Sequence, residues 1–272
     1  MTSNLLRLDV TNIISRSLSE SASQLHVVDP TPSTLNALID VATNETGELP
    51  ALRVLATNSV CKETFETFLV ASRAADLIDG GTLSLRTLET TPTNSLLLTD
   101  ESVIAVVAVG DQIAGLTTTD EAFVAHSTET YRDHWNNATP YTLLTPPLSA
   151  VRRTLTDEIG KQTRTDFDAV LNAVETTRDT SDGLDEVTIS LLVAARNGVL
   201  LYDISKWGED VGIASKATFS RSKTALEERG LIATEKVPID VGRPRLRLKL
   251  GDETLANDRT EEFAAAVTDL LG

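Results

Sequence analysis

Residues 202–237, YDISKWGEDVGIASKATFSRSKTALEERGLIATEKV, decide the fold of the carboxy-terminal part of the chain. The first ten of them carry apolar side chains at helical spacing, and Gly212 ends that pattern. A longer helix is expected to begin at Ser215, whose hydroxyl can accept from the free amides of a first turn, and to end at Gly230. A further helix is expected before them, over 185–197. A short helix, a glycine turn and a longer helix predict a helix-turn-helix.

The longer helix is predicted to expose side chains that suit DNA. Ala217, Phe219 and Leu226 are expected to face inward, and no acidic residue precedes Glu227. A helix in the major groove needs small residues where backbones approach, and cationic or hydroxyl side chains that reach base edges and phosphates. A generic surface helix is the alternative, but in so acidic a chain it would be expected to carry several carboxylates here. The candidate DNA-binding residues of this helix are Ser215, Lys216, Thr218, Ser220, Arg221 and Lys223.

Two strands are expected next, over 231–237 and 246–250, joined by PIDVGRPR. The basic residues of this hairpin occupy alternate positions and are therefore expected to share one strand face. A basic wing of this kind follows the phosphate backbone or enters the minor groove. An edge hairpin with solvated charges is the alternative. The candidate DNA-binding residues of the wing are Arg243, Arg245 and Arg247.

The distribution of charge supports this hypothesis. The chain has a net charge of −16 and only 4% aromatic residues, yet residues 202–250 hold ten Lys and Arg against seven Asp and Glu. A basic surplus in an acidic chain indicates a polyanionic partner. The overall acidity is typical of a protein from a salt-loaded, halophilic cytoplasm, where screening makes self-repulsion weak. An acidic binding surface is the alternative.

The first 145 residues are predicted to form an α/β domain with a mixed sheet, because helical and strand patterns alternate and a run of strands follows. The apolar run 103–109, VIAVVAV, is expected to be a central strand. Helices are expected over 5–21, 33–46, 60–79 and 120–137, and strands over 25–30, 52–57, 83–88, 95–99, 103–109 and 112–117.

Prolines at 140, 146 and 147 mark a linker. We expect a regulatory and dimerisation domain over 1–145, a helical linker over 146–180, a winged helix-turn-helix over 181–252 and a terminal helix over 253–272. The linker helices and the terminal helix have apolar faces that could pair with a second copy or pack within their own chain. A symmetric dimer would present two recognition helices to a palindrome about one helical turn apart.

Motifs for catalysis and cofactors are missing from the sequence. No histidine has a lysine two residues on, as phospholipase D chemistry requires, and there is no GxSxG, phosphate loop, CxxC or HExxH. We expect no enzyme, no cofactor and no metal, since His126 and His134 suggest no third ligand. Cys61 begins a helix, which would lower a thiol pKa, but a buried cysteine is expected rather than a redox sensor. Without a membrane-length apolar run or a secretory signal, the cytoplasm is expected.

The segments KATFSRSKTALEERGLIATEK and VGRPRLRL resemble the winged helices of MarR and TrmB regulators, in which the recognition helix ends in L…GLI and a GRP sequence shapes the wing. The whole chain is similar to the haloarchaeal TbsP family of transcriptional regulators. This resemblance implies binding to promoter DNA and control of central carbon metabolism genes alongside TrmB. The amino-terminal domain resembles the effector domain of TrmB regulators, which is like phospholipase D in fold, and no sugar-binding residue can be carried over.

The sequence therefore predicts a DNA-binding repressor or activator that acts as a homodimer on double-stranded promoter DNA and senses a small metabolite through its amino-terminal domain. Two alternatives are a protein-binding winged helix that assembles a complex without touching DNA, and an enzyme whose site lies in the amino-terminal domain.

Overall fold

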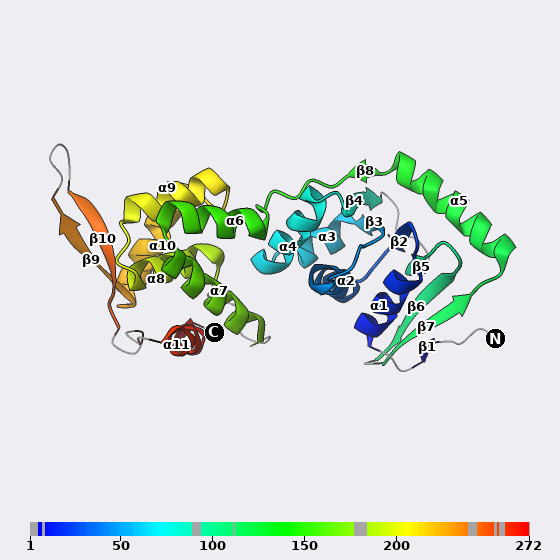
Figure 1. Ribbon diagram of the computed structural model, residues 1–272, viewed down its shortest axis with the longest axis horizontal. Coiled ribbons are helices and arrows are strands. Elements are labelled where there is room, and N and C mark those ends of the chain that lie inside the picture. Colours follow the sequence, from blue (N-terminus) through cyan, green and yellow to red (C-terminus); the bar gives the residue numbers. More distant parts are fainter. Residues whose placement is uncertain are drawn as a thin grey trace. The chain divides into compact units, whose positions relative to one another are not determined.

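The computed structural model describes residues 5–6, 9–88, 94–110, 112–176, 184–238, 244–252, 255 and 259–271. The chain divides into two compact units, residues 1–147 and 148–272. The first contains a mixed sheet with helices and the second a winged helix-turn-helix, which confirms the predicted fold class (Figure 1). Within the described ranges, no helix is long and apolar enough to cross a membrane.

The sheet of the first unit has eight strands among the described residues, in the order β1-β7-β6-β5-β2-β3-β4-β8. β2, β3 and β4 are parallel, and the other neighbours are antiparallel. The strands are β1 Leu5–Leu6, β2 Gln24–Val28, β3 Ala51–Thr57, β4 Leu83–Leu88, β5 Leu96–Leu98, β6 Val103–Val109, β7 Gln112–Thr118 and β8 Thr139–Pro140. The helices are α1 Val10–Glu20, α2 Pro32–Asn44, α3 Asn58–Thr64, α4 Phe68–Asp79 and α5 Glu121–Asn137.

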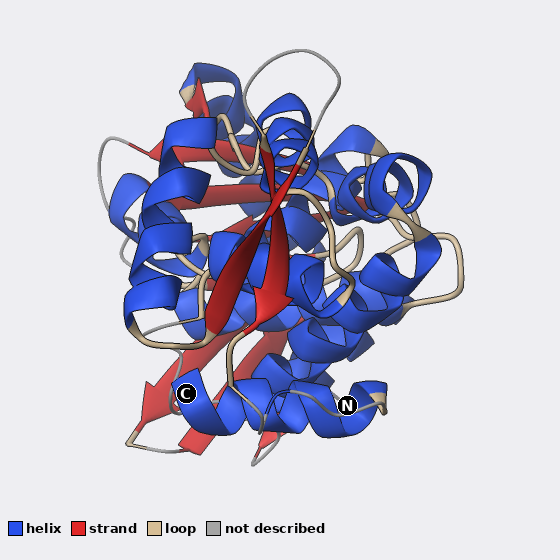
Figure 2. Ribbon diagram, turned by 90° about the vertical axis from the view of Figure 1, so that its left-hand side faces the viewer, coloured by secondary structure: helices blue, strands red, loops and turns tan. Residues whose placement is uncertain are grey.

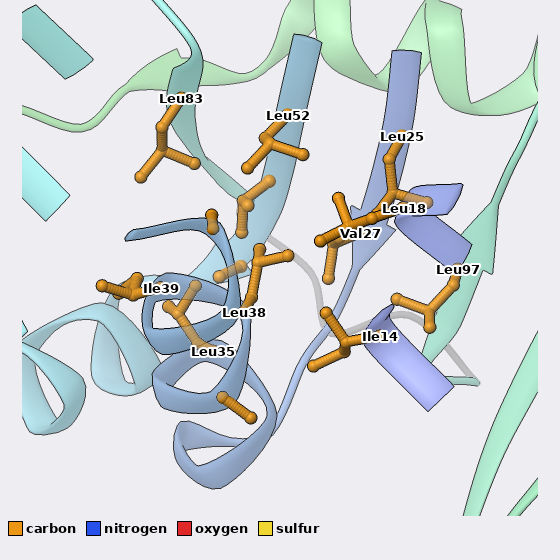
Figure 3. Close-up of a cluster of buried hydrophobic side chains, with 14 of the residues drawn as sticks. Ile14, Leu18, Leu25, Val27, Leu35, Leu38, Ile39, Leu52, Leu83 and Leu97 are labelled. Carbon is orange, nitrogen blue, oxygen red and sulfur yellow. The ribbon is translucent and has the colours of Figure 1, made fainter. Parts of the chain in front are cut away.

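Helices α1 to α4 cover one face of this sheet. Their apolar side chains meet those of β2 to β6 in the main core, of which Figure 3 shows the part between α1, α2 and the strands. Ile14 of α1, Leu38 of α2 and Val54 of β3 are fully buried there. Burying one apolar side chain of this size contributes roughly 1.5–3 kcal/mol to the stability of the folded state. This core therefore holds the helices on the sheet.

Among the described residues, α5 is the helix that covers the opposite face (Figure 1). Val124 and Trp135 of α5 pack on the strands, and Arg86 of β4 donates from Nη1 to the carbonyls of Trp135 at 2.8 Å and Ala138 at 3.3 Å. These carbonyls belong to the carboxyl end of α5, where a cation is favourable.

β6 differs from the central strand that its sequence predicts. It lies third from the β1 edge, and its burial decreases along its length until Val107 is 39% and Val109 is 74% exposed. The reason is that α5 covers only the end of β6 near Val103. The apolar run therefore does not mark a strand buried on both faces in this chain.

Two predicted helices are also divided differently. The helix expected over 60–79 is broken into α3 and α4, because Phe65 leaves the helical path and packs on the ring of Tyr141 at 5.9 Å. The segment expected as a helix over 5–21 begins with strand β1 and continues as α1 after the cap Asp9.

The second unit contains helices and a hairpin. Its elements are α6 Leu148–Thr154, the π-helical turn η1 Leu155–Ile159, α7 Lys161–Thr176, α8 Glu186–Arg196, α9 Leu201–Val211, α10 Lys216–Glu228, β9 Ile232–Val237, β10 Arg245–Leu250 and α11 Thr260–Leu271. Figure 2 shows the β9–β10 hairpin in front of the helices. α11 packs along α7 with Phe263 and Val267 fully buried, so its apolar face is taken up within its own chain.

Candidate DNA-binding surface

The crossing of α9 and α10 depends on two glycines. Gly212 ends α9 with φ at 91°, a left-handed conformation that glycine adopts without strain. Gly208 faces the fully buried ring of Phe219 in α10, and a Cβ at Gly208 would lie 2.3 Å from two ring carbons. Ser215 then begins α10 and accepts from the amide of Thr218 at 3.2 Å. The predicted helix-turn-helix is therefore confirmed, and this contact sets how closely its helices approach.

One face of α10 is open to solvent. We call it the recognition face and define it by four exposed residues at helical spacing: Ala217, Ser220, Arg221 and Thr224. All four have small or cationic side chains. Ala217 was expected to face inward, and the structure places it outward because Phe219 and Leu226 fill the buried side instead.

Lys223 lies outside the recognition face. Its side chain is only 13% exposed, and its ammonium donates to Glu227 Oε2 at 2.7 Å. Thr234 of β9 donates to the other carboxylate oxygen at 2.8 Å. Burial alone would raise the pKa of Glu227, but these two hydrogen bonds and the nearby charge outweigh it and lower the pKa. Glu227 therefore joins α10 to the wing and also holds the Lys223 ammonium, whereas the sequence predicted an outward-pointing lysine.

Lys216, at the start of α10, is exposed and paired. Its ammonium lies 2.6 Å from Glu209 Oε2, and its backbone amide donates to Glu209 Oε1 at 3.3 Å. The side-chain hydrogen bond between them raises the pKa of Lys216 and lowers the pKa of Glu209. The carboxylate of Glu209 in α9 thus neutralises the charge of Lys216, the first cation of α10.

The wing is tied to the helices at its base. β9 and β10 pair over six positions, and Leu200 forms an isolated antiparallel bridge with Arg247. The amide of Leu248 donates to the carbonyl of Val199 at 2.9 Å. These two contacts hold the residues between α8 and α9 against β10 and fix β10 beside the amino end of α9.

Buried Asp166 of α7 connects the helices that carry the wing. Its carboxylate is fully buried, accepts from Asn197 at 2.8 Å and from Thr260 at 2.9 Å, and lies 3.2 Å from Arg196 Nε. Asn197 is the C-cap of α8 and lies two residues before Val199, which accepts the hydrogen bond from β10. One side chain thus joins α7, α8 and α11 beneath the wing.

The cations of β10 share one strand face, as their alternation predicts. Arg245 stacks over the ring of Tyr202 at 4.3 Å and lies 3.4 Å from Asp203 Oδ1. Lys249 pairs with Glu235 at 2.7 Å, and Arg247 is exposed. Arg243 lies outside the described residues.

An open pocket of about 300 Å³ brings the two elements together. Lys216 and Ser220 of α10 line one side, and Arg245 of the wing lines the other. Tyr202 and Ser205 of α9 form the remaining polar wall. The sequence did not predict these two residues of α9 as part of the site. Their position at the start of a short helix was the only indication that it offered.

The cysteine and the histidines that the sequence offers as candidate functional residues all lie in the first unit. Burial raises the pKa of Cys61 to about 11, so desolvation outweighs the helix end and the thiolate form is disfavoured. His126 and His134 are both exposed on α5, and the described residues contain no cluster of three metal-ligating side chains. His26 is buried beside Trp135, with ring centroids 6.3 Å apart.

Two solved structures show distant similarity to parts of this chain. TrmBL2, described as an archaeal chromatin protein with a novel mode of DNA binding, is 17% identical over 50% of this chain and 52% of its own, with a TM-score of 0.37. The chain thus spans about half the length of TrmBL2. NucT from Helicobacter pylori is 10% identical over 51% of this chain and 98% of its own, with a TM-score of 0.35. No curated protein matches the sequence.

Family models cover nearly the whole chain. The amino-terminal model of TbsP-like transcriptional regulators matches residues 2–146, and the carboxy-terminal helix-turn-helix model of the same regulators matches residues 147–268. The first match alone spans more than half of the chain, and the second contains the surface described above. The chain belongs to the family of TbsP-like transcriptional regulators.

Proposed function

We propose that this regulator binds specific sequences in double-stranded promoter DNA through the recognition face and the wing. The observation that carries the proposal is the pocket in which Lys216 and Ser220 of the recognition helix meet Arg245 of the wing. In an acidic chain, cations and hydroxyls converge there from two elements of a helix-turn-helix. That arrangement suits a duplex, whose groove and backbone must be contacted together.

Each candidate residue has a role that follows from its position. Arg221 and Ser220, exposed in the middle of α10, would reach base edges in the major groove. Ser215, Lys216 and Thr218, in the first turn of that helix, would contact the phosphates beside the groove, where a helix amino end favours anions. Arg243, Arg245 and Arg247 would hold the flanking backbone or enter the minor groove. Lys223 would act indirectly, because it pairs with Glu227, which accepts a hydrogen bond from Thr234 of the wing.

Three further parts of the proposal concern the biology of the regulator. A homodimer would place two recognition faces on a palindromic operator. The family resemblance supports genes of central carbon metabolism as targets, and the separate α/β unit supports regulation by a small metabolite. The cytoplasm is the proposed location, since the template is promoter DNA.

The decisive test compares DNA binding by the native chain and by the Arg221→Glu/Arg247→Glu variant. Within the described part of the chain, neither arginine lies within salt-bridge distance of a carboxylate, so both are available to DNA. Sites would be selected from a random DNA pool and affinities measured by fluorescence anisotropy. We expect the native chain to select discrete sequences and the variant to bind them about a hundredfold more weakly or worse, because two cations become anions facing phosphates.

Arg16→Glu is the control, since Arg16 is half exposed on α1 of the other unit and the substitution makes the same change of charge as each single substitution of the double variant. It should leave affinity within about twofold. If the native chain selects no sequence, or if the double variant binds as well as the native chain, the winged helix instead serves protein assembly and the proposal fails.

A further inference from the structure

The part of the sheet that α5 leaves uncovered is apolar on its outer surface. Residues directly opposite each other in β6 and β7 point to the same side, and the pairs on this side are Ala105 with Leu116, Val107 with Ala114, and Val109 with Gln112. We define the hairpin face as Ala105, Val107, Val109, Ala114 and Leu116. Val107, Val109 and Leu116 are 39%, 74% and 46% exposed.

This composition is unusual for a surface that faces water. Antiparallel sheets with one solvated face alternate between apolar inward and polar outward residues. β6, VIAVVAV, is apolar on both faces, and neither β6 nor β7 contains a charged residue. In a chain with 24% charged residues, fourteen such positions would carry about three. Charge depletion with exposed aliphatic side chains is typical of the core of a protein interface.

The charge of the first unit indicates what covers this face. Residues 1–147 hold eighteen Asp and Glu against seven Lys and Arg. Two copies of this unit repel wherever their acidic surfaces approach, so a contact between copies must use a surface that lacks charge. A basic partner would instead be steered to the acidic surface, where the charges complement each other. An uncharged apolar face complements itself under a two-fold axis without matched ion pairs.

The other apolar candidate for self-association is already occupied. Phe263 and Val267 of the terminal helix are buried against α7 of the same chain. Among the described residues, three of the seven large apolar side chains that are exposed lie on the hairpin face. Phe123, which is 52% exposed in the first turn of α5, follows β7 by five residues.

We infer that the hairpin face of β6 and β7 is the dimerisation surface of this regulator, where it packs sheet to sheet against the same face of a second copy. The inference rests on the proposed function only in assigning the dimer to the DNA-bound form. Two sheets that pack this way lie about 10 Å apart and interdigitate their side chains.

The test measures self-association of the full chain by sedimentation velocity over a range of concentrations. We expect the native chain to dimerise and Val107→Glu/Val109→Glu to self-associate about a hundredfold more weakly, because each carboxylate would be buried without a partner. Leu144→Glu is the matched control, since Leu144 is the most exposed large apolar residue of the described part of the chain, at 88%, and lies in the same unit. It should leave the dimer intact.

A second measurement covers the case in which the double variant fails to fold. Val107→Cys and Leu144→Cys would each be treated with a short bis-maleimide. The native Cys61 is fully buried and should give little background. Cross-linked dimers should form with Val107→Cys and should be at least tenfold fewer with Leu144→Cys.

The inference is overturned if the native chain is monomeric at all concentrations, if Val107→Glu/Val109→Glu dimerises like the native chain, or if both cysteine variants cross-link equally. DNA binding separates this failure from failure of the proposed function. A folded monomeric variant should still bind a single half-site with unchanged affinity, and it should lose about tenfold or more on the palindrome. A native dimer that binds no specific DNA would refute the proposed function and leave the dimer surface standing.

Discussion

The two units of this chain carry their charge differently. Residues 1–147 have eighteen acidic residues against seven basic ones, whereas residues 148–272 have twenty-two against seventeen. In the first unit the most unusual surface is the hairpin face, which has no charge at all. In the second it is the recognition face and wing, where cations gather but most of them are balanced by a carboxylate. All three histidines lie in the first unit.

Because the chain is acidic as a whole, the charge of each surface has to be judged against that acidic average. An apolar patch or a paired lysine would attract no notice in a protein of average composition. In this acidic chain, the hairpin face of the first unit is unusual because it has no charge. The recognition face and wing of the second unit are unusual because they carry cations. Both departures fall on contiguous surfaces of the fold, and we propose a partner of different chemistry for each.

The largest expected effect concerns the core beneath the DNA-binding surface. Phe219→Ala should lower the free energy of unfolding of the second unit by about 3–5 kcal/mol, because it removes a fully buried ring that fills the space beside Gly208. Trp207 is buried in the same helix pair and reports the transition by fluorescence during denaturant unfolding. Thr224→Ala, on the exposed side of α10, is the control and should change stability by less than about 0.5 kcal/mol. A similar loss in both variants would contradict the assigned packing.

A smaller effect is expected on the stability of the first unit, which should depend on pH through His26. Burial, with the charges of Arg53 and Arg132, lowers the pKa of His26 from 6.5 to about 4, against an opposing effect of Asp100. Above pH 6.5 His26 is neutral in both the folded and the unfolded chain. As pH falls from 6.5 to 4, the unfolded chain binds a proton that the folded chain does not, so folded stability is lost. The loss between pH 7 and pH 4.5 should be about 2.5 kcal/mol.

The measurement is denaturant unfolding at both pH values, followed through Trp135, which lies beside His26. Trp207→Phe would serve as the background so that Trp135 alone reports. His26→Gln should abolish about 2.5 kcal/mol of the pH dependence, and exposed His126→Gln should not. An unchanged pH dependence in His26→Gln would show that other groups carry it.

The smallest expected effect concerns the balanced cations of the DNA-binding surface. Six cations lie on α10 and β10, and four of them, Lys216, Lys223, Arg245 and Lys249, pair with carboxylates. When a phosphate replaces a carboxylate, the freed acid takes up a cation and offsets the counterion released from DNA. The two unpaired arginines of α10 and β10 then contribute about −2 to the slope of log affinity against log salt, whereas phosphate contacts by all six cations would contribute about −5.

Glu209→Gln should sharpen this difference. It frees Lys216 and should steepen the slope by about one, which amounts to roughly a tenfold greater loss of affinity over a tenfold rise in potassium chloride. Anisotropy titrations from 0.2 to 2 M salt would measure it, and Glu228→Gln is the control, since the salt bridges found among the described residues do not include Glu228. A native slope near −5 would show that the pairs do not persist in solution.

Much of the fold could be predicted because local patterns and tertiary packing agree. Gly212, Ser215 and Gly230 mark the ends of α9 and α10 in the sequence, and the alternating cations of the wing mark β10. The break between α3 and α4 could not be predicted, because no glycine or proline stands there and the cause is a contact between Phe65 and distant Tyr141. The exposure of β6 also depends on distant packing, since the reach of α5 decides it.

The candidate site was predictable in its residue types but not in its partners. Helical spacing identifies Arg221 and Ser220 as outward. It cannot show that Glu227 holds Lys223 inward or that Glu209 pairs with Lys216 across the turn, because those contacts depend on how α9, α10 and β9 meet. Tyr202 joins the site through the bridge that brings β10 beside α9.

The lysine–carboxylate pairs also set how long the regulator stays on DNA that is not its operator. Association without sequence preference depends almost entirely on unbalanced positive charge. A surface whose lysines are already neutralised has little hold on random duplex, so each visit should be brief and the protein should leave by dissociation rather than slide far. The time spent on wrong sites then shrinks, and the search for an operator proceeds mainly through solution.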